Sequence, residues 1–358
     1  MRFLFKTSYD QDINLIEHSG QAFWYGLLMV VLVSAPWWLD TYPLDQLSFV
    51  LIYGIVGLGL MVLAGYTGLF SMGHAAFLGV GAYAQALLTA AGWPFFLSIP
   101  ASGALAAAVG VVVGLPALRV KGIYLAIATL AFGFIVEEVI ARWEPLTGGN
   151  TGLMVKKAQA WGWTIESDRD FYFLCLTVAV LSTLIVLNLL RSPTGRSFVA
   201  VRDSEVSAQC MGIHLARTKT MAFAISAFFT GVGGALYAHK VTYLTPEQFG
   251  ILQSIDLLLL VTIGGLGSVH GAFLGALFLV TAPQGIALVK DHLPPAIGQA
   301  PGLQPFVYGL VLVAIVLFEP RGLYGRWLKV RTWLQLFPFY RRGLFKRQKS
   351  YQKSERLR

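Results

Sequence analysis

The amino-acid sequence predicts an all-α polytopic membrane protein with about ten transmembrane segments, on the basis of composition, apolar runs and charge asymmetry. Of the 358 residues, 56% are hydrophobic and only 13% are charged, and the mean hydropathy is +0.65. These values are far too apolar for an ordinary soluble domain. Apolar runs near the ~20 residues that an α-helix needs to cross a bilayer recur along most of the chain.

Ten apolar runs are the candidate transmembrane helices of a domain covering residues 23–320. In chain order they are residues 23–39, 48–64, 74–91, 95–118, 122–141, 171–190, 220–238, 251–266, 270–289 and 304–319. The eighth run is short, so we expect a half-helix or a tilted segment there. Residues 1–22 contain three acidic side chains and no apolar core, which predicts a cytoplasmic N-terminal segment and no cleavable signal.

The distribution of lysine and arginine predicts the orientation of the chain. With the N-terminus in the cytoplasm, 21 of the 27 basic residues fall on the cytoplasmic side of a ten-span topology and six fall outside. Cytoplasmic loops of membrane proteins carry this excess. Both termini are therefore expected in the cytoplasm, and the net charge of +9 indicates attraction to anionic lipid rather than to nucleic acid.

The sequence contains no pattern that indicates a cofactor site or an enzyme active site. Cys175 lies in a predicted span and Cys210 in a cytoplasmic loop, so we expect no disulfide, and no His/Cys cluster has metal-site spacing. The dipeptide Gly-Lys, which a phosphate-cradling loop requires, does not occur. No nucleophile or carboxylate constellation suggests catalysis. Any ATP-driven work must therefore be done by another chain, and no cofactor is expected.

A glycine-rich stretch, GYTGLFSMGHAAFLGVGAY (65–83), predicts a broken helix at membrane depth. GLFSMGHAAFLG (68–79) is partly repeated in GLGSVHGAFLG (265–275), and paired Gly-interrupted segments in a transporter indicate a site at a repeat interface. Non-helical backbone is tolerated at membrane depth where it lines a cavity or is buried in protein. The candidate residues of a translocation path are Gly68, Ser71, Gly73, His74, Gly79, Tyr83, Gly264, Gly267 and His270. Small-residue packing between helices is the alternative.

The segment 191–219 predicts a capped cytoplasmic helix between two spans. We expect Pro193 and Gly195 to break the chain after the sixth span, Asp203 or Ser204 to cap a helix of about two turns, and Gly212 to end it in a left-handed cap. A rigid projection of this kind suits docking into a groove on a partner. An ordinary solvated loop with caps is the alternative.

Two further segments carry signals. The outer loop 142–169 contains three tryptophans and TGGNTGL, and an ordered loop of this length is expected to be functional.

In the basic tail 321–358, Leu323, Trp327, Val330 and Leu334 share one face of a predicted helix over 323–337. Basic residues flank that face, so we expect this helix to lie on anionic lipid, with a disordered extension as the alternative.

The chain resembles the membrane permease subunits of branched-chain amino acid ABC importers. The blocks that carry the resemblance are residues 65–83, LRVKGIYLAIATLAFG (118–133), TGGNTGL (147–153), GRSFVAVRDSEVSAQCMGI (195–213), SAFFTGVGGALYA (226–238) and GGLGSVHGAFLGA (264–276), in the family's order. The chain is most similar to the permease that carries the Thr-Gly-Gly outer loop. Two features depart from the family's pattern: TGGNTGL, where an acidic residue often precedes the last glycine, and the long basic tail.

The resemblance implies a function and a set of partners. It implies a heterodimer with a second permease, two cytoplasmic ATPase subunits and an extracytoplasmic substrate-binding protein, in a bacterial plasma (inner) membrane. Gly195, Arg196, Arg202, Asp203, Glu205, Ala208 and Gly212 match the family's ATPase-coupling loop. The implied substrates are branched-chain or related amino acids, with urea, short amides or small organic acids as the alternative.

An ion-coupled secondary carrier is the competing class of function. Such a carrier places ionisable residues deep in its spans. Glu137, Glu138, Lys290 and Asp291 are expected near span ends, whereas Asp256 lies about a turn and a half into the eighth span. The spans therefore disfavour this class, with Asp256 as the residue to examine.

Overall fold

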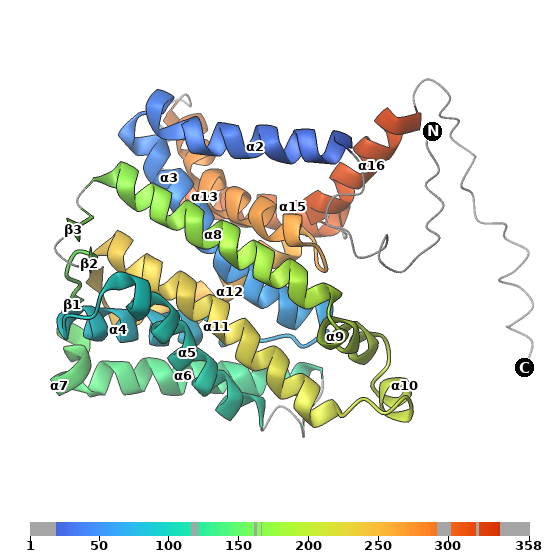
Figure 1. The fold of residues 1–358 in the computed structure, drawn as a ribbon, viewed down its shortest axis with the longest axis horizontal. Helices are drawn as coiled ribbons and strands as arrows, with labels where there is room; N and C mark the ends of the chain where they lie inside the picture. The colour runs from blue at the N-terminus through green and yellow to red at the C-terminus, as the bar shows by residue number, and fades with distance from the viewer. Residues whose placement is uncertain are drawn as a thin grey trace, which may run out of the picture.

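The computed structural model describes residues 19–115, 120, 122–160, 163–165, 167–291, 302–319 and 322–336, and these are mainly helical (Figure 1). Each of the ten predicted runs contains a helix. The helices are α2 (Ser19–Trp38), α3 (Thr41–Leu60), α4 (His74–Ala90), α5 (Phe95–Gly114), α6 (Ile123–Arg142), α8 (Asp168–Arg191), α11 (Leu215–Val241), α12 (Ile251–Gly264), α13 (Val269–Asp291) and α15 (Leu303–Phe318). The predicted N-terminal segment up to residue 18 and the tail beyond residue 336 lie outside the described residues.

The all-α membrane class is confirmed, and the expected count of about ten spans stays a prediction. Among the described residues, seven helical segments are long and apolar enough to cross a membrane: Thr41–Tyr66, Phe95–Gly114, Ile123–Arg142, Asp168–Arg191, Leu215–Val241, Pro246–Gly264 and Val269–Lys290. Helix α12 has only 14 residues, as expected of the short eighth run, but the 3-10 turn η4 (Pro246–Phe249) precedes it. The combined segment reaches 19 residues.

Helices α3 and α11 form the buried centre of the bundle, and α6 and α13 present most of their surface outward. Small residues let the central helices approach closely. A Cβ atom on Gly59 of α3 would lie 2.6 Å from the carbonyl oxygen of Ser226 on α11. Helices in lipid gain no hydrophobic free energy when they associate. Close approach of their backbones stabilises the bundle through van der Waals contacts instead.

The connecting elements separate to opposite ends of the bundle in Figure 1. One end carries α7 (Glu144–Thr147), η3 (Gly149–Thr151) and four two-residue strands. These are β1 (Leu153–Met154), paired antiparallel with β4 (Tyr243–Leu244), and β2 (Gln159–Ala160), paired antiparallel with β3 (Trp163–Thr164). The other end carries α9 (Pro193–Asp203), α10 (Glu205–Cys210) and α16 (Gly322–Leu336). The predicted outer loop and the predicted cytoplasmic loop therefore lie at opposite ends.

The glycine-rich stretch breaks a helix inside the bundle, as the sequence predicts. Helix α3 continues into the π-helix η1 (Met61–Tyr66), residues 67–73 are not helical, and α4 begins at His74. The His74 ring reaches Ser226, near the middle of α11, so α4 starts at membrane depth. The backbone of the break is buried against α6, where the Met72 amide donates to the Thr129 hydroxyl over 3.0 Å.

The second glycine-rich segment (265–275) also contains a non-helical break between two helices. Helix α12 ends at Gly264, Gly265 and Gly267 take positive φ angles of 113° and 82°, and α13 begins at Val269. Helices α4 and α13 both run from the α9 end of the bundle toward the strand end (Figure 1). The two segments therefore have the same orientation, as the ten-span topology predicts.

Candidate coupling and translocation site

Helix α9 begins where the sequence predicted a break. The Ser192 side chain accepts a hydrogen bond from the Gly195 amide, and Pro193 occupies the first turn. Serine is a favoured N-cap, and proline at the first helical position loses no intrahelical hydrogen bond. The expectation that Gly195 breaks the chain is wrong, because Gly195 lies inside α9. A Cβ atom there would meet the Leu189 carbonyl oxygen at 2.4 Å, so the glycine permits a tight turn between α8 and α9.

Helix α10 is the short capped helix that the sequence predicts. The Ser204 hydroxyl accepts from the Ser207 amide over 3.2 Å. At the other end, the Gly212 amide donates to the Gln209 carbonyl and the Ile213 amide donates to the Ala208 carbonyl, both over 3.0 Å. This double pattern, with Gly212 at φ +83°, is a Schellman cap.

The tip of α10 combines an anchored face with an exposed apolar face. Ala208 is buried, whereas Val206 is 70% and Met211 is 85% exposed. The Lys219 ammonium lies 2.7 Å from the Glu205 carboxylate, and the Lys219 side chain is only 3% exposed. Sequence reasoning identified Glu205 but missed Lys219, its partner on α11. The ion pair connects α10 to the first turns of α11.

Arg202 joins the predicted coupling segment to the glycine-rich break. Its Nη1 donates to the Gly65 carbonyl oxygen over 3.1 Å, and its Nη2 lies 3.1 Å from the Asp203 carboxylate. Gly65 belongs to the last turn of η1, where carbonyl groups lack intrahelical partners. Arg202 therefore caps the end of the broken span, a contact that sequence reasoning missed because it links residues 137 positions apart.

The two glycine segments meet at the same place. The Gly267 amide lies 3.1 Å from the Met61 sulfur, and a Cβ atom on Gly65 would fall 2.6 Å from the Gly267 nitrogen. Gly68 and Gly267 both border the Arg202 side chain. The structure thus brings Gly65, Gly68, Gly267 and Arg202 into one junction between α9, η1 and the start of α13.

Most of the remaining candidate path residues are packed in this conformation. Ser71, Gly73, His74, Gly79, Tyr83 and Gly264 are buried, whereas Gly68 and His270 are exposed. The His74 Nε2 lies 3.0 Å from the Ser226 hydroxyl oxygen, and the Tyr83 ring packs edge-on against Phe249. These contacts are those of close-packed helices.

His270 is separated from His74 and has different surroundings. Its ring stacks on Tyr324 of α16 with centroids 5.5 Å apart, and its Nε2 lies 2.8 Å from the Tyr25 hydroxyl oxygen. The two predicted histidines therefore do not form one site. In the part of the chain that the structure describes, no group of three or more His, Cys, Asp or Glu side chains could hold a metal ion.

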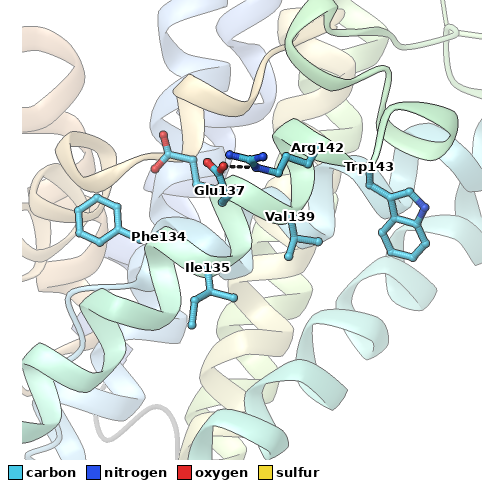
Figure 2. Close-up of a pocket in the computed structure, with 7 residues that line it drawn as sticks. Phe134, Ile135, Glu137, Val139, Arg142 and Trp143 are labelled. Atoms are coloured by element: carbon cyan, nitrogen blue, oxygen red, sulfur yellow. Dashed lines mark hydrogen bonds and ion pairs between the residues drawn. The ribbon is translucent and has the colours of Figure 1, made fainter.

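A groove of about 880 Å³ runs along the outward face of α6 (Figure 2). Its lining is mainly apolar, and includes Phe134, Ile135 and Trp143. It also holds Glu137 and the ion pair between Glu138 and Arg142. Glu137, Glu138 and Arg142 lie in the last two turns of α6, so this surface changes from apolar to charged toward the strand end of the helix.

Comparisons with known proteins identify relatives over most of the chain. The family model of the branched-chain amino acid transport system permease component matches residues 42–316. The chain is 33% identical over 321 residues to the high-affinity branched-chain amino acid transport system permease protein LivM of Escherichia coli strain K12, covering 83% of this chain and 73% of that protein. No solved structure matches the chain at a significant level.

Two other relatives extend the range of similar proteins. Identity is 26% over 233 residues with the probable branched-chain amino acid transport permease protein LivM of Methanocaldococcus jannaschii, covering 61% of this chain and 66% of that protein. Identity is 31% over 144 residues with the autoinducer 2 import system permease protein LsrC of Photorhabdus laumondii, covering 37% of this chain and 39% of that protein. The second match is confined to a minor part of both chains.

Proposed function

Because the chain belongs to the permease family of branched-chain amino acid transport systems, an ABC importer family, we propose that it forms half of the importer's membrane pore. The cargo that we propose is branched-chain or related amino acids, with urea, short amides or small organic acids as the alternative. The observation that carries the proposal is the junction at Arg202, where a capped, projecting segment contacts both glycine-broken segments.

The proposed assembly contains this chain, a second permease, two ATPase subunits and an extracytoplasmic substrate-binding protein. Supporting this assembly, α9 and α10 lie at the end of the bundle opposite to α7 and the strands (Figure 1). Our proposal places the α10 end, with both chain termini, in the cytoplasm of a bacterial cell whose plasma membrane holds the protein. The basic residues of α9 and α16 favour this orientation.

We assign ATPase coupling to the segment from Gly195 to Gly212. The exposed side chains Val206 and Met211 give α10 an apolar tip suited to a groove on the ATPase. Displacement of α10 reaches α11 through the Lys219–Glu205 ion pair and reaches the broken span through Arg202 and Gly65. Movement of the junction would then change the packing of the glycine segments, which alters access along the proposed path.

We assign contact with the substrate-binding protein to the outer loop 142–169. Its strand β1 is tied to β4 by the pairs Leu153 with Leu244 and Met154 with Tyr243. Met154 is exposed, as is Trp143 at the start of the loop. An ordered loop with exposed large apolar side chains supports a docking role.

Co-purification and stimulated ATP hydrolysis test both assignments together. Met211→Asp introduces a charge at the tip of α10, so the ATPase should dissociate from the purified complex and ATP-dependent leucine uptake should be lost. Met154→Asp, a matched change at the other end, should leave the ATPase bound and reduce only the stimulation by the binding protein. Retention of ATPase and full uptake in Met211→Asp would contradict the coupling role of α10.

A further inference from the structure

A cavity of about 280 Å³ lies among α3, α12, α13 and α15, away from the junction at Arg202. Its polar and aromatic lining is Gln46, Phe49, Tyr53, Gln253, Asp256 and Tyr308, and three residues of α13 complete it with apolar surface. Gln46 and Tyr53 lie on α3, Gln253 and Asp256 in the first two turns of α12, and Tyr308 near the start of α15. The cavity is therefore in the half of the bundle nearest the strands (Figure 1).

Asp256 supplies the only charged side chain in the cavity lining. Within the described ranges, its carboxylate makes no hydrogen bond or ion pair with another side chain. Lys240, a buried cation of the same half of the bundle, pairs with Asp45 and Asp168 instead. An intramembrane carboxylate is costly, and such residues usually mark a substrate or ion pathway.

The rest of the lining favours an organic ammonium group over other ligands. Tyr53 and Tyr308 contribute aromatic rings, and such rings attract ammonium cations through their faces. The third ring of the lining, Phe49, already lies 6.0 Å from the Lys240 ammonium. Gln46 and Gln253 offer amide donors and acceptors. A hard metal cation requires about six oxygen ligands and several carboxylates at high affinity, whereas this cavity has one carboxylate.

The volume of the cavity limits the size of the ligand. Pockets for small molecules usually measure ~300–1,000 Å³, so this one lies at the lower end of the range. It has room for a solute the size of a single amino acid. A carboxylate or other polar group of the solute would meet the amide and phenol donors, because the lining contains no basic side chain.

We propose that this cavity, the Asp256 cavity, binds a small solute through its ammonium group, with Asp256 as the counter-ion. This inference rests on the proposed function in one respect. It assumes that the bound compound is cargo of the assembled importer. The Asp256 cavity is then an intermediate binding site for cargo inside this subunit, in the half of the bundle that the proposed function assigns to the side of the binding protein.

The test uses the complete complex of this chain with its partner permease and ATPases in lipid nanodiscs, without the binding protein. Binding of tritiated L-leucine is measured by equilibrium dialysis. Isopentylamine, which keeps the ammonium group and lacks the carboxylate, should displace leucine. Equal concentrations of 4-methylpentanoate, which lacks the ammonium group, and of NaCl should not. No leucine binding, or displacement by 4-methylpentanoate or NaCl as effective as by isopentylamine, would overturn the proposal.

Variants connect the binding to the cavity. Asp256→Asn keeps the shape and removes the charge, and should weaken leucine binding on the order of tenfold or more, as expected for a charged hydrogen bond. Glu247→Gln removes an exposed carboxylate nine positions earlier and should leave binding unchanged. Val280→Trp fills the cavity without changing charge and should also abolish binding. Unchanged binding in an assembled Asp256→Asn or Val280→Trp complex would overturn the proposal.

ATP-driven uptake in proteoliposomes with the binding protein separates the two proposals. If the wild-type complex transports leucine and Asp256→Asn transports and binds as well as Glu247→Gln, the cavity inference fails and the proposed function stands. If the wild-type complex shows no ATP-driven uptake, the proposed function fails, and the binding results still decide whether the cavity takes an ammonium compound.

Discussion

At the scale of single residues, Arg202 connects the proposed coupling segment to the end of the broken span. Its guanidinium donates both to a carbonyl at the end of η1 and to Asp203, a geometry that the planar, forked guanidinium allows and that a lysine ammonium cannot reproduce. The sequence resemblance placed Arg202 among the residues that match the family's ATPase-coupling loop. It could not identify Gly65 as the acceptor, because that contact depends on where η1 ends in space.

Replacing Arg202 should impair transport more than assembly. Arg202→Ala removes the charged hydrogen bond to the Gly65 carbonyl, worth about 1.5–3 kcal/mol, so ATP-dependent uptake in proteoliposomes should fall on the order of tenfold. Arg202→Lys should also be impaired, because a lysine cannot bridge both acceptors. Arg217→Ala, at an exposed arginine in the first turn of α11, serves as the control. Equal uptake by the Arg202 and Arg217 variants would show that the Gly65 contact is not used.

The ion pair between Lys219 and Glu205 should reveal itself in a double-mutant cycle. Removing one partner of a buried pair typically costs about 3–5 kcal/mol, whereas replacing both with apolar residues is often neutral. Lys219→Leu and Glu205→Leu should therefore each lower the melting temperature of the detergent-solubilised complex, and the double variant should recover most of the loss. Additive losses in the double variant would show that the two side chains act independently.

At the scale of elements, the caps of α10 could be predicted from sequence and the start of α9 could not. Ser204, one of two predicted N-caps, and Gly212 are confirmed, because a capping serine and a left-handed glycine have local physical causes. The sequence analysis expected Pro193 and Gly195 to break the chain. In the structure, Pro193 is the first residue of α9, and Gly195 lies inside α9 in close contact with the end of α8. The serine before the proline was the overlooked signal, since Ser-Pro also begins helices.

Substitution of Gly212 tests the need for a rigid α10. Gly212 has φ +83° and no neighbour within 4 Å of an added Cβ atom, so a side chain there changes only the backbone energy. Gly212→Val should strain the left-handed cap by about 1–2 kcal/mol and lower substrate-stimulated ATP hydrolysis. Gly212→Asn, which tolerates this conformation, should retain most of the activity. Equal loss in both variants would assign the effect to the side chain rather than to the cap.

At the scale of the whole molecule, apolar runs predicted the helices and their order, because helix length in a membrane follows bilayer thickness. The number of complete spans could not be predicted as firmly, since η4 lengthens α12 and α4 begins within the bundle. Close packing was also hidden from sequence. Small residues serve both path lining and helix contact, and only the structure shows that His74 and Tyr83 are buried in this conformation.

The outward face of α6 is where we expect the second permease to bind. Among the outward-facing helices, α6 combines exposed Phe134 and Ile135 with the Glu137 carboxylate and the Glu138–Arg142 ion pair (Figure 2). An apolar surface with charged residues at its edge is typical of a subunit interface, and these charges lie in the last two turns of α6. The exposed stretch of α8 around Leu181 and Ile185 carries no charge and suits lipid.

Photocrosslinking in native membranes distinguishes the two faces. A photoreactive amino acid in place of Ile135 should crosslink to the second permease, and one in place of Leu181 should label lipid alone. Ile135→Asp should reduce the amount of second permease that co-purifies with this chain, because the added charge would lack a partner in the interface. Crosslinking of the second permease from position 181 but not from position 135 would place the subunit interface on α8 and leave the α6 carboxylates to another partner.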